Sequence, residues 1–76
     1  MEKNKTIEEI QREIAASAWL DEKQASIYAN VTVSALQSWR HQSRGFAYTR
    51  AGRKILYKKT DIDKYLEGNR VEVAAS

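Results

Sequence analysis

The stretch VTVSALQSWRH, residues 31–41, decides the fold, because it predicts a short capped helix with one apolar side and one uncharged polar side. Thr32 is the expected N-cap, since its hydroxyl can accept from the first N–H groups of the helix. Leu36 and Trp39 are three residues apart and share the face expected to be buried. Another face carries polar residues at spacings of i, i+3, i+4 and i+7, namely Ser34, Gln37, Ser38 and His41.

Uncharged polar side chains of this kind hydrogen-bond to base edges in the DNA major groove, where a good bidentate pair discriminates by about 1–3 kcal/mol. The alternative is an ordinary surface helix with a polar outside. The helix alone leaves both interpretations open.

The charge of the following residues favours the first interpretation. The net charge is only +3, but residues 40–59 contain seven basic residues and no acid. A basic block of this kind is the electrostatic footprint of a phosphate-binding surface. A solvated lysine-rich face is the alternative, although acids would normally be interspersed on it. The seven are Arg40, Arg44, Arg50, Arg53, Lys54, Lys58 and Lys59.

Size and composition limit the class of protein. A 76-residue chain makes one small domain, which buries about 60% of its unfolded surface. The sequence has no cysteine for a disulfide or thiolate metal site, and no signal-peptide or membrane-span pattern. We therefore expect a cytoplasmic protein without membrane association. No catalytic set is visible, and we expect no enzyme activity, cofactor, metal or small-molecule ligand.

Two helices are expected before the polar stretch. Thr6 and Glu9 form a capping-box pattern for a helix over residues 7–16, whose stripe of Ile7, Ile10 and Ile14 could cover the domain or pair with another copy.

The second helix is expected over residues 22–29, after an extended pair, Trp19 and Leu20, of which Trp19 is expected in the core. Asp21 is its predicted N-cap, with Gln24 completing the box. Asn30 is the predicted left-handed stop, and the short link to Thr32 indicates a helix-turn-helix, with Val31 filling the space between the helices.

After the polar helix, residues 46–50 and 54–58 are β-favouring runs on either side of residues 51–53, with Gly52 in the turn. This predicts a β-hairpin wing whose inward side chains are Tyr48, Ile55 and Tyr57. The basic side chains expected at the tip and outer side of this wing are Arg50, Arg53, Lys54 and Lys58.

A last helix is predicted from Thr60 as N-cap to Gly68, with Asp61 and Asp63 near its positive end. Its apolar stripe is Ile62, Tyr65 and Leu66. The predicted fold class is mainly α with a small β-hairpin, a winged helix-turn-helix. The predicted division is an N-terminal helix in residues 1–17, the winged helix-turn-helix in 18–67 and a disordered tail in 68–76.

The combined motifs of residues 18–67 resemble the excisionase-type helix-turn-helix domains, which are related to MerR-like regulators and to small phage regulators of the AlpA type. The matching features are the Trp19-Leu20 pair, the spacing of Leu36 to Trp39, the Gly52-Arg53 turn with Tyr57, and the Asp-Ile-Asp start of the last helix. The chain departs from the family in lacking prolines before the wing, where residues 46–47 stand, and in having Asn30 where glycine is usual.

This resemblance implies that the second helix of the motif enters the major groove and that the wing lies against the backbone or minor groove. The residues assigned to DNA from the recognition helix are Thr32, Ser34, Gln37, Ser38, Arg40 and His41. Those assigned to the backbone and wing contacts are Arg44, Arg50, Arg53, Lys54 and Lys58.

The resemblance further implies a phage or mobile-element excisionase that bends recombination-site double-stranded DNA, with an integrase or further copies of the chain as partners on the DNA. A small transcriptional regulator is an alternative within this class. A protein-interaction module that retains the fold and uses the isoleucine stripe is a third interpretation.

Overall fold

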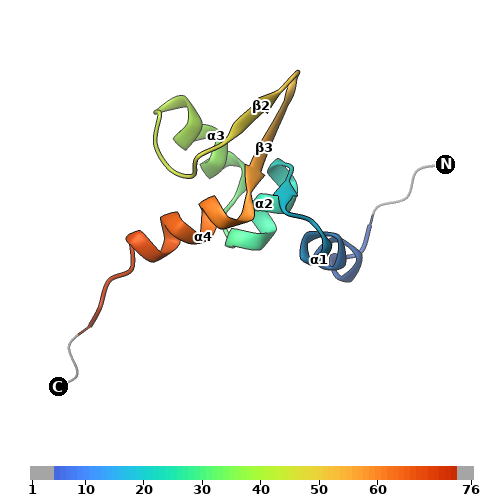
Figure 1. Cartoon of the computed structure of the whole chain (residues 1–76), viewed down its shortest axis with the longest axis horizontal. Helices are drawn as coiled ribbons and strands as arrows, with labels where there is room; N and C mark the ends of the chain where they lie inside the picture. The colour runs from blue at the N-terminus through green and yellow to red at the C-terminus, as the bar shows by residue number, and fades with distance from the viewer. Residues whose placement is uncertain (1–4, 74–76) are drawn as a thin grey trace.

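The computed structural model describes residues 5–73, which form four helices and a three-stranded antiparallel sheet (Figure 1). The predicted fold class, a winged helix-turn-helix with an additional N-terminal helix, is confirmed. In chain order the elements are α1 (Ile7–Ala16), β1 (Trp19–Leu20), α2 (Glu22–Ala29), α3 (Val33–His41), β2 (Thr49–Ala51), β3 (Lys54–Lys58) and α4 (Lys59–Gly68).

Short-range hydrogen bonds fix the first three helices as the sequence predicts. Both capping boxes are present, at Thr6 with Glu9 and at Asp21 with Gln24. The Thr32 hydroxyl accepts from the N–H of Ala35 at 2.9 Å and caps α3. These local bonds satisfy N–H groups that a helix start would otherwise leave without partners.

Asn30 turns the chain between α2 and α3. Its φ of 59° is left-handed, a conformation that Asn tolerates better than most residues, so it can stand where the domains that the sequence resembles usually have glycine. Val31, the next residue, is half-buried against the core, as predicted.

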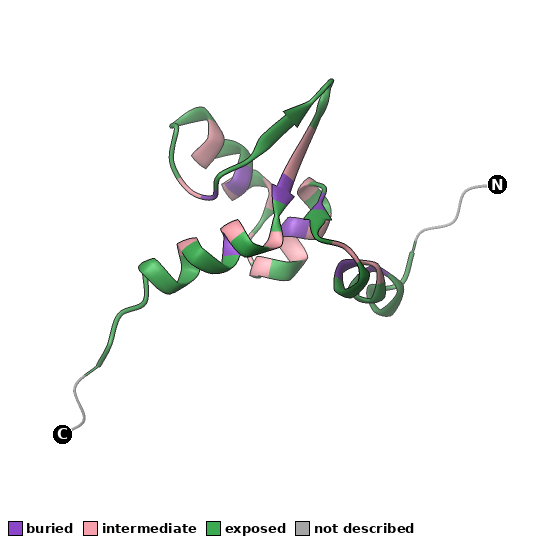
Figure 2. Cartoon of the chain, in the orientation of Figure 1, coloured by how far each residue is buried: buried purple, intermediate pink, exposed green. Residues whose placement is uncertain are grey.

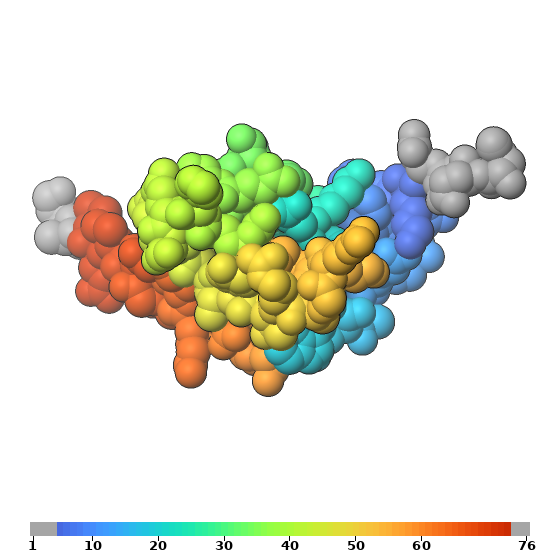
Figure 3. Space-filling view, turned by 90° about the horizontal axis from the view of Figure 1, so that it is seen from above, coloured from blue at the N-terminus to red at the C-terminus, as the bar shows by residue number. Residues whose placement is uncertain are grey.

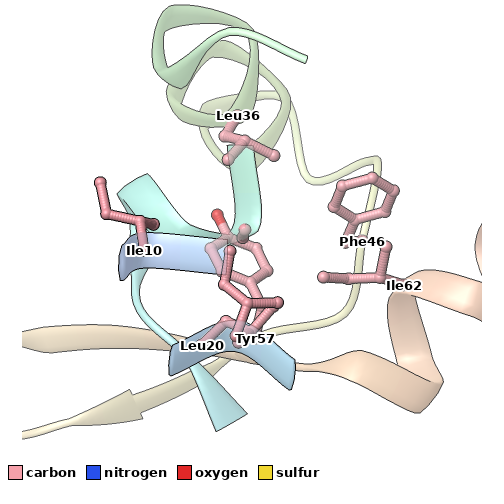
Figure 4. Packing of buried hydrophobic residues seen from close by; sticks show 8 residues of the cluster. Ile10, Leu20, Leu36, Phe46, Tyr57 and Ile62 are labelled. Carbon is pink, nitrogen blue, oxygen red and sulfur yellow. The ribbon is translucent and has the colours of Figure 1, made fainter. Parts of the chain in front are cut away.

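The hydrophobic core lies where α1, α2, α3, α4 and the base of the sheet meet (Figures 2 and 4). The largest fully buried side chains are Tyr57, Leu20, Leu36 and Ile62. Phe46 closes one side of this cluster, with its ring edge-on to Trp39, Tyr57 and Tyr65. The core therefore joins α3, the expected recognition helix, to the wing of β2 and β3 and to α4.

The α1 helix covers the domain rather than presenting its apolar stripe to a partner. Ile10 and Ile14 belong to the core, whereas Ile7 is 56% exposed. The Lys59 ammonium donates to the Ile14 carbonyl at 2.8 Å and so binds the C-terminus of α1 to the start of α4. Lys59, one of the seven residues of the basic block, thus stabilises the fold.

The sheet has a strand that the sequence analysis did not predict. Its order is β1-β3-β2, and Trp19 and Leu20 pair with Lys58 and Tyr57. Because alternate residues of a strand point to opposite faces, Leu20 enters the core and Trp19 lies on the other face, 43% exposed. The expectation of a buried Trp19 is therefore wrong.

The first wing strand is shorter than predicted. β2 includes only Thr49–Ala51, because the residues before it form the loop that leaves α3. In this loop Phe46 enters the core, whereas Tyr48 is 40% exposed. The expected inward position of Tyr48 is wrong, and Phe46 fills that role.

The α4 helix begins two residues earlier than predicted, at Lys59. Its N-cap is Lys58, without a side-chain cap bond, and not Thr60. The Lys59 N–H donates to the Ala18 carbonyl at 2.9 Å, so the strand pairing continues into the first residue of the helix. Ile62 is buried, but Leu66 is exposed. Residues 69–73 of the predicted tail form no helix or strand, and residues 74–76 lie outside the described part.

The position of α1 predicts a difference between two of its isoleucines. Ile14→Ala should lower the free energy of unfolding by about 2–5 kcal/mol, because it leaves a cavity in the core. Ile7→Ala, the matched control on the same helix, should change it by less than about 0.5 kcal/mol. Urea denaturation followed by circular dichroism measures both, and equal effects would contradict the packing of α1.

Candidate nucleic-acid interface

The recognition helix and the wing stand next to each other on one side of the molecule. Figure 3 shows α3 in green beside the yellow and orange hairpin of β2 and β3. Between them is a hollow of about 280 Å³, lined by Gln37, Arg40, His41, Tyr48 and Arg50. The uncharged polar face of α3 and one side of the wing therefore meet at a common surface.

The polar face of α3 is exposed to solvent. Leu36 is buried and Trp39 half-buried, so the helix is oriented by its apolar side. Thr32 is also exposed, but its hydroxyl is occupied as the N-cap of the helix. The four polar residues expected to meet bases are all exposed, namely Ser34, Gln37, Ser38 and His41.

Arg40 has partners on α2, on β3 and in the loop before β2, and is not a free surface cation. Its Nη1 donates to Glu22 Oε2 at 2.8 Å and to the Tyr57 hydroxyl at 2.9 Å. Its guanidinium also lies 5.8 Å from the centre of the Tyr48 ring. The hydrogen bond that Arg40 donates to the Glu22 carboxylate raises the pKa of Arg40 above its ordinary value. Arg40 thus connects α2, α3 and the wing.

Arg44 lies in the loop that leaves α3. Its guanidinium is 5.6 Å from the centre of the Trp39 ring, and its Nε donates to Gln42 Oε1 at 2.8 Å. The loop reaches this position through Gly45, which has a φ of +91°. A Cβ there would approach Trp39 to 2.8 Å, so only glycine permits the contact.

The basic side chains of the wing are divided between its two faces. Arg50 pairs with Ile55 and therefore shares the face that lines the hollow beside α3, so its predicted outer position is wrong. Lys54 and Lys58 alternate with Ile55 and lie on the other face. There the Lys58 ammonium is 5.6 Å from the centre of the Trp19 ring. Arg53 lies in the turn with Gly52.

A family profile described as a helix-turn-helix domain matches residues 19–70. The chain belongs to this helix-turn-helix domain family. The matched region includes α2, α3, the wing and α4, and begins after α1. A comparison with curated proteins gave no match. Within residues 5–73, no helix has the length and apolar character needed to cross a membrane.

Sequence reasoning missed Glu22 as part of the helix-turn-helix interface. The neighbouring capping box explains residues 21 and 24, and nothing local marks Glu22 as a partner of α3. Its carboxylate reaches Gln37 and Arg40, which are 15 and 18 residues further along the chain. The sequence shows only that Glu22 is an acid near the predicted start of a helix, and that a basic block without acids follows from Arg40 to Lys59.

The hairpin turn yields a prediction about salt dependence. Arg53→Ala should weaken binding to all DNA sequences and should reduce the slope of log affinity against log salt by about 1, because one phosphate contact is lost. Lys64→Ala on α4 removes the same charge away from the wing and serves as the matched control. Fluorescence anisotropy at several salt concentrations measures both, and an unchanged slope for Arg53→Ala would count against the wing contact.

Proposed function

We propose that this chain is a sequence-specific double-stranded DNA-binding protein that inserts α3 into the major groove and lays the wing on the neighbouring backbone. The observation that carries the proposal is the juxtaposition of an exposed, uncharged face of α3 with Arg50 across one hollow. Base edges are read by hydrogen bonds from such a face, whereas phosphate contacts position the protein. The family match supports the same partner.

The phosphate contacts come from fewer residues than the seven of the basic block. Arg40 is bound to Glu22 and Tyr57, and Lys59 is bound to the C-terminus of α1. The remaining five are Arg44, Arg50, Arg53, Lys54 and Lys58. Because Lys54 and Lys58 lie on the outer face of the wing, full contact requires the duplex to lie against more than one side of the hairpin.

Within this class, we propose an excisionase that bends recombination-site DNA, acting with an integrase or with further copies of the chain. The resemblance of residues 18–67 supports this assignment, as does the short wing, whose tip projects from the sheet (Figure 1). A domain of this size makes a small footprint, which favours binding at several sites. A small transcriptional regulator is the alternative.

The protein-interaction module receives no comparable support. Its partner surface was the isoleucine stripe of α1, and Ile10 and Ile14 lie in the core of the domain. Only Ile7 stays exposed. We also propose that the protein has no enzyme activity, because His41 shares the hollow beside α3 with Gln37, Arg40, Tyr48 and Arg50, and no serine, cysteine or carboxylate is among these lining residues.

The DNA proposal predicts a defined response to salt and to one substitution. With up to five phosphate contacts, affinity should fall by up to about 500-fold between 50 and 200 mM salt. Gln37→Ala should reduce preference for the cognate site while leaving binding to unrelated DNA unchanged. Anisotropy titrations with both DNAs test this. Salt-independent binding would overturn the proposal, and an equal loss on both DNAs would contradict base reading by Gln37.

The excisionase assignment predicts DNA bending. Circularly permuted fragments that carry the site should migrate differently on native gels when the protein is bound, with the slowest complex when the site is central. A free-DNA series of the same fragments is the control for intrinsic curvature. Complexes that all migrate alike would favour the transcriptional regulator.

A further inference from the structure

We propose that Glu22 is a positioning residue that fixes the amide orientation of Gln37 and thereby directs α3 to an adenine in the major groove. This inference rests on the proposed DNA binding and specifies which base one side chain reads. Glu22 is the first residue of α2 and faces the middle of α3 across the helix-turn-helix.

Both oxygens of the Glu22 carboxylate are engaged by α3. Oε2 accepts from Arg40 Nη1 at 2.8 Å, and Oε1 accepts from Gln37 Nε2 at 3.2 Å. The side chains of Arg40 and Glu22 are only 20% and 26% exposed. Arg40 is itself held by the Tyr57 hydroxyl at 2.9 Å. The carboxylate is therefore a fixed acceptor rather than a mobile surface acid.

A fixed acceptor dictates which end of the Gln37 amide turns inward. A carboxylate offers only acceptors, so the amide presents its NH₂ group to Glu22 and keeps its carbonyl oxygen away. The carbonyl oxygen and one N–H remain for a ligand. Gln37 is exposed and lines the hollow between α3 and the wing, so these two groups are available to DNA.

One acceptor and one donor match adenine among the bases of the major groove. Adenine presents the N6 amino donor and the N7 acceptor, and a glutamine amide pairs with both. Guanine presents two acceptors, O6 and N7, and the carbonyl oxygen of the oriented amide would face one of them. Glu22 thus favours an A·T pair at the position that Gln37 meets, without touching the base itself.

The test is selection of binding sites from a random double-stranded DNA library by the full-length protein and its variants, followed by sequencing. The base pair read by Gln37 is identified as the one whose preference disappears in Gln37→Ala. In the wild-type selection this pair should be A·T. If it is any other pair, the inference is overturned, and this comparison requires no change at Glu22.

The second comparison uses Glu22→Gln, which is nearly isosteric. The new amide keeps its oxygen on Arg40 and turns its NH₂ group toward Gln37, whose amide then reverses and exposes its own NH₂ group. The preference for adenine over guanine at that pair should fall by about 5- to 150-fold, the equivalent of one good bidentate contact. An unchanged preference in a folded variant, checked by thermal melting, would overturn the inference.

Two controls separate this effect from the general gain of affinity that accompanies loss of a negative charge. Glu67→Gln on α4 makes the same charge change far along the chain and should leave every base preference intact. In the Gln37→Ala background, Glu22→Gln should no longer alter the preference at the assigned pair. If the wild-type protein selects no sequence at all, the DNA-binding proposal itself fails, which is distinguishable from a site whose Gln37 pair does not respond to Glu22→Gln.

Discussion

The guanidinium of Arg40 holds the helix-turn-helix and the wing in one arrangement. It bonds to Glu22 on α2 and to the Tyr57 hydroxyl on β3, while belonging to α3. A guanidinium is planar and directs its N–H groups in fixed directions, so these bonds constrain angle as well as distance. In a domain with so small a core, that constraint sets the spacing between the surface of α3 and the wing.

The ion pair of Arg40 with Glu22 also reduces the net positive charge that the basic block contributes to the surface. Residues 40–59 contain seven basic residues, but Arg40 neutralises Glu22, and Lys59 binds the carbonyl groups of Ile14 and Ala15. The wing then divides its basic side chains between two faces, with Arg50 toward α3 and Lys58 beside Trp19. A block that is continuous in sequence therefore leaves a smaller set of basic groups for the phosphate contacts of the proposed function.

Features that depend on neighbours within a few residues were predictable from the sequence. The caps at Thr6, Asp21 and Thr32 and the turn at Asn30 all form within one helical turn of the residue concerned. The features that were missed join distant segments, because no local pattern records them. Trp19 pairs with Lys58 across 39 residues, and this pairing both creates the third strand and turns the tryptophan outward. Glu22 was overlooked for the same reason.

A carboxylate beside a DNA-facing helix has two opposing effects on the proposed function. It repels phosphates and so lowers the affinity for every DNA sequence. It also denies the Gln37 amide one of its two orientations, which weakens binding to sites that would need the other. Because Arg40 forms an ion pair with Glu22 at 2.8 Å, the repulsion is reduced while the orientation is kept. Glu22 therefore contributes more to the difference between sequences than to binding itself, which suits a small domain that must find one site among many.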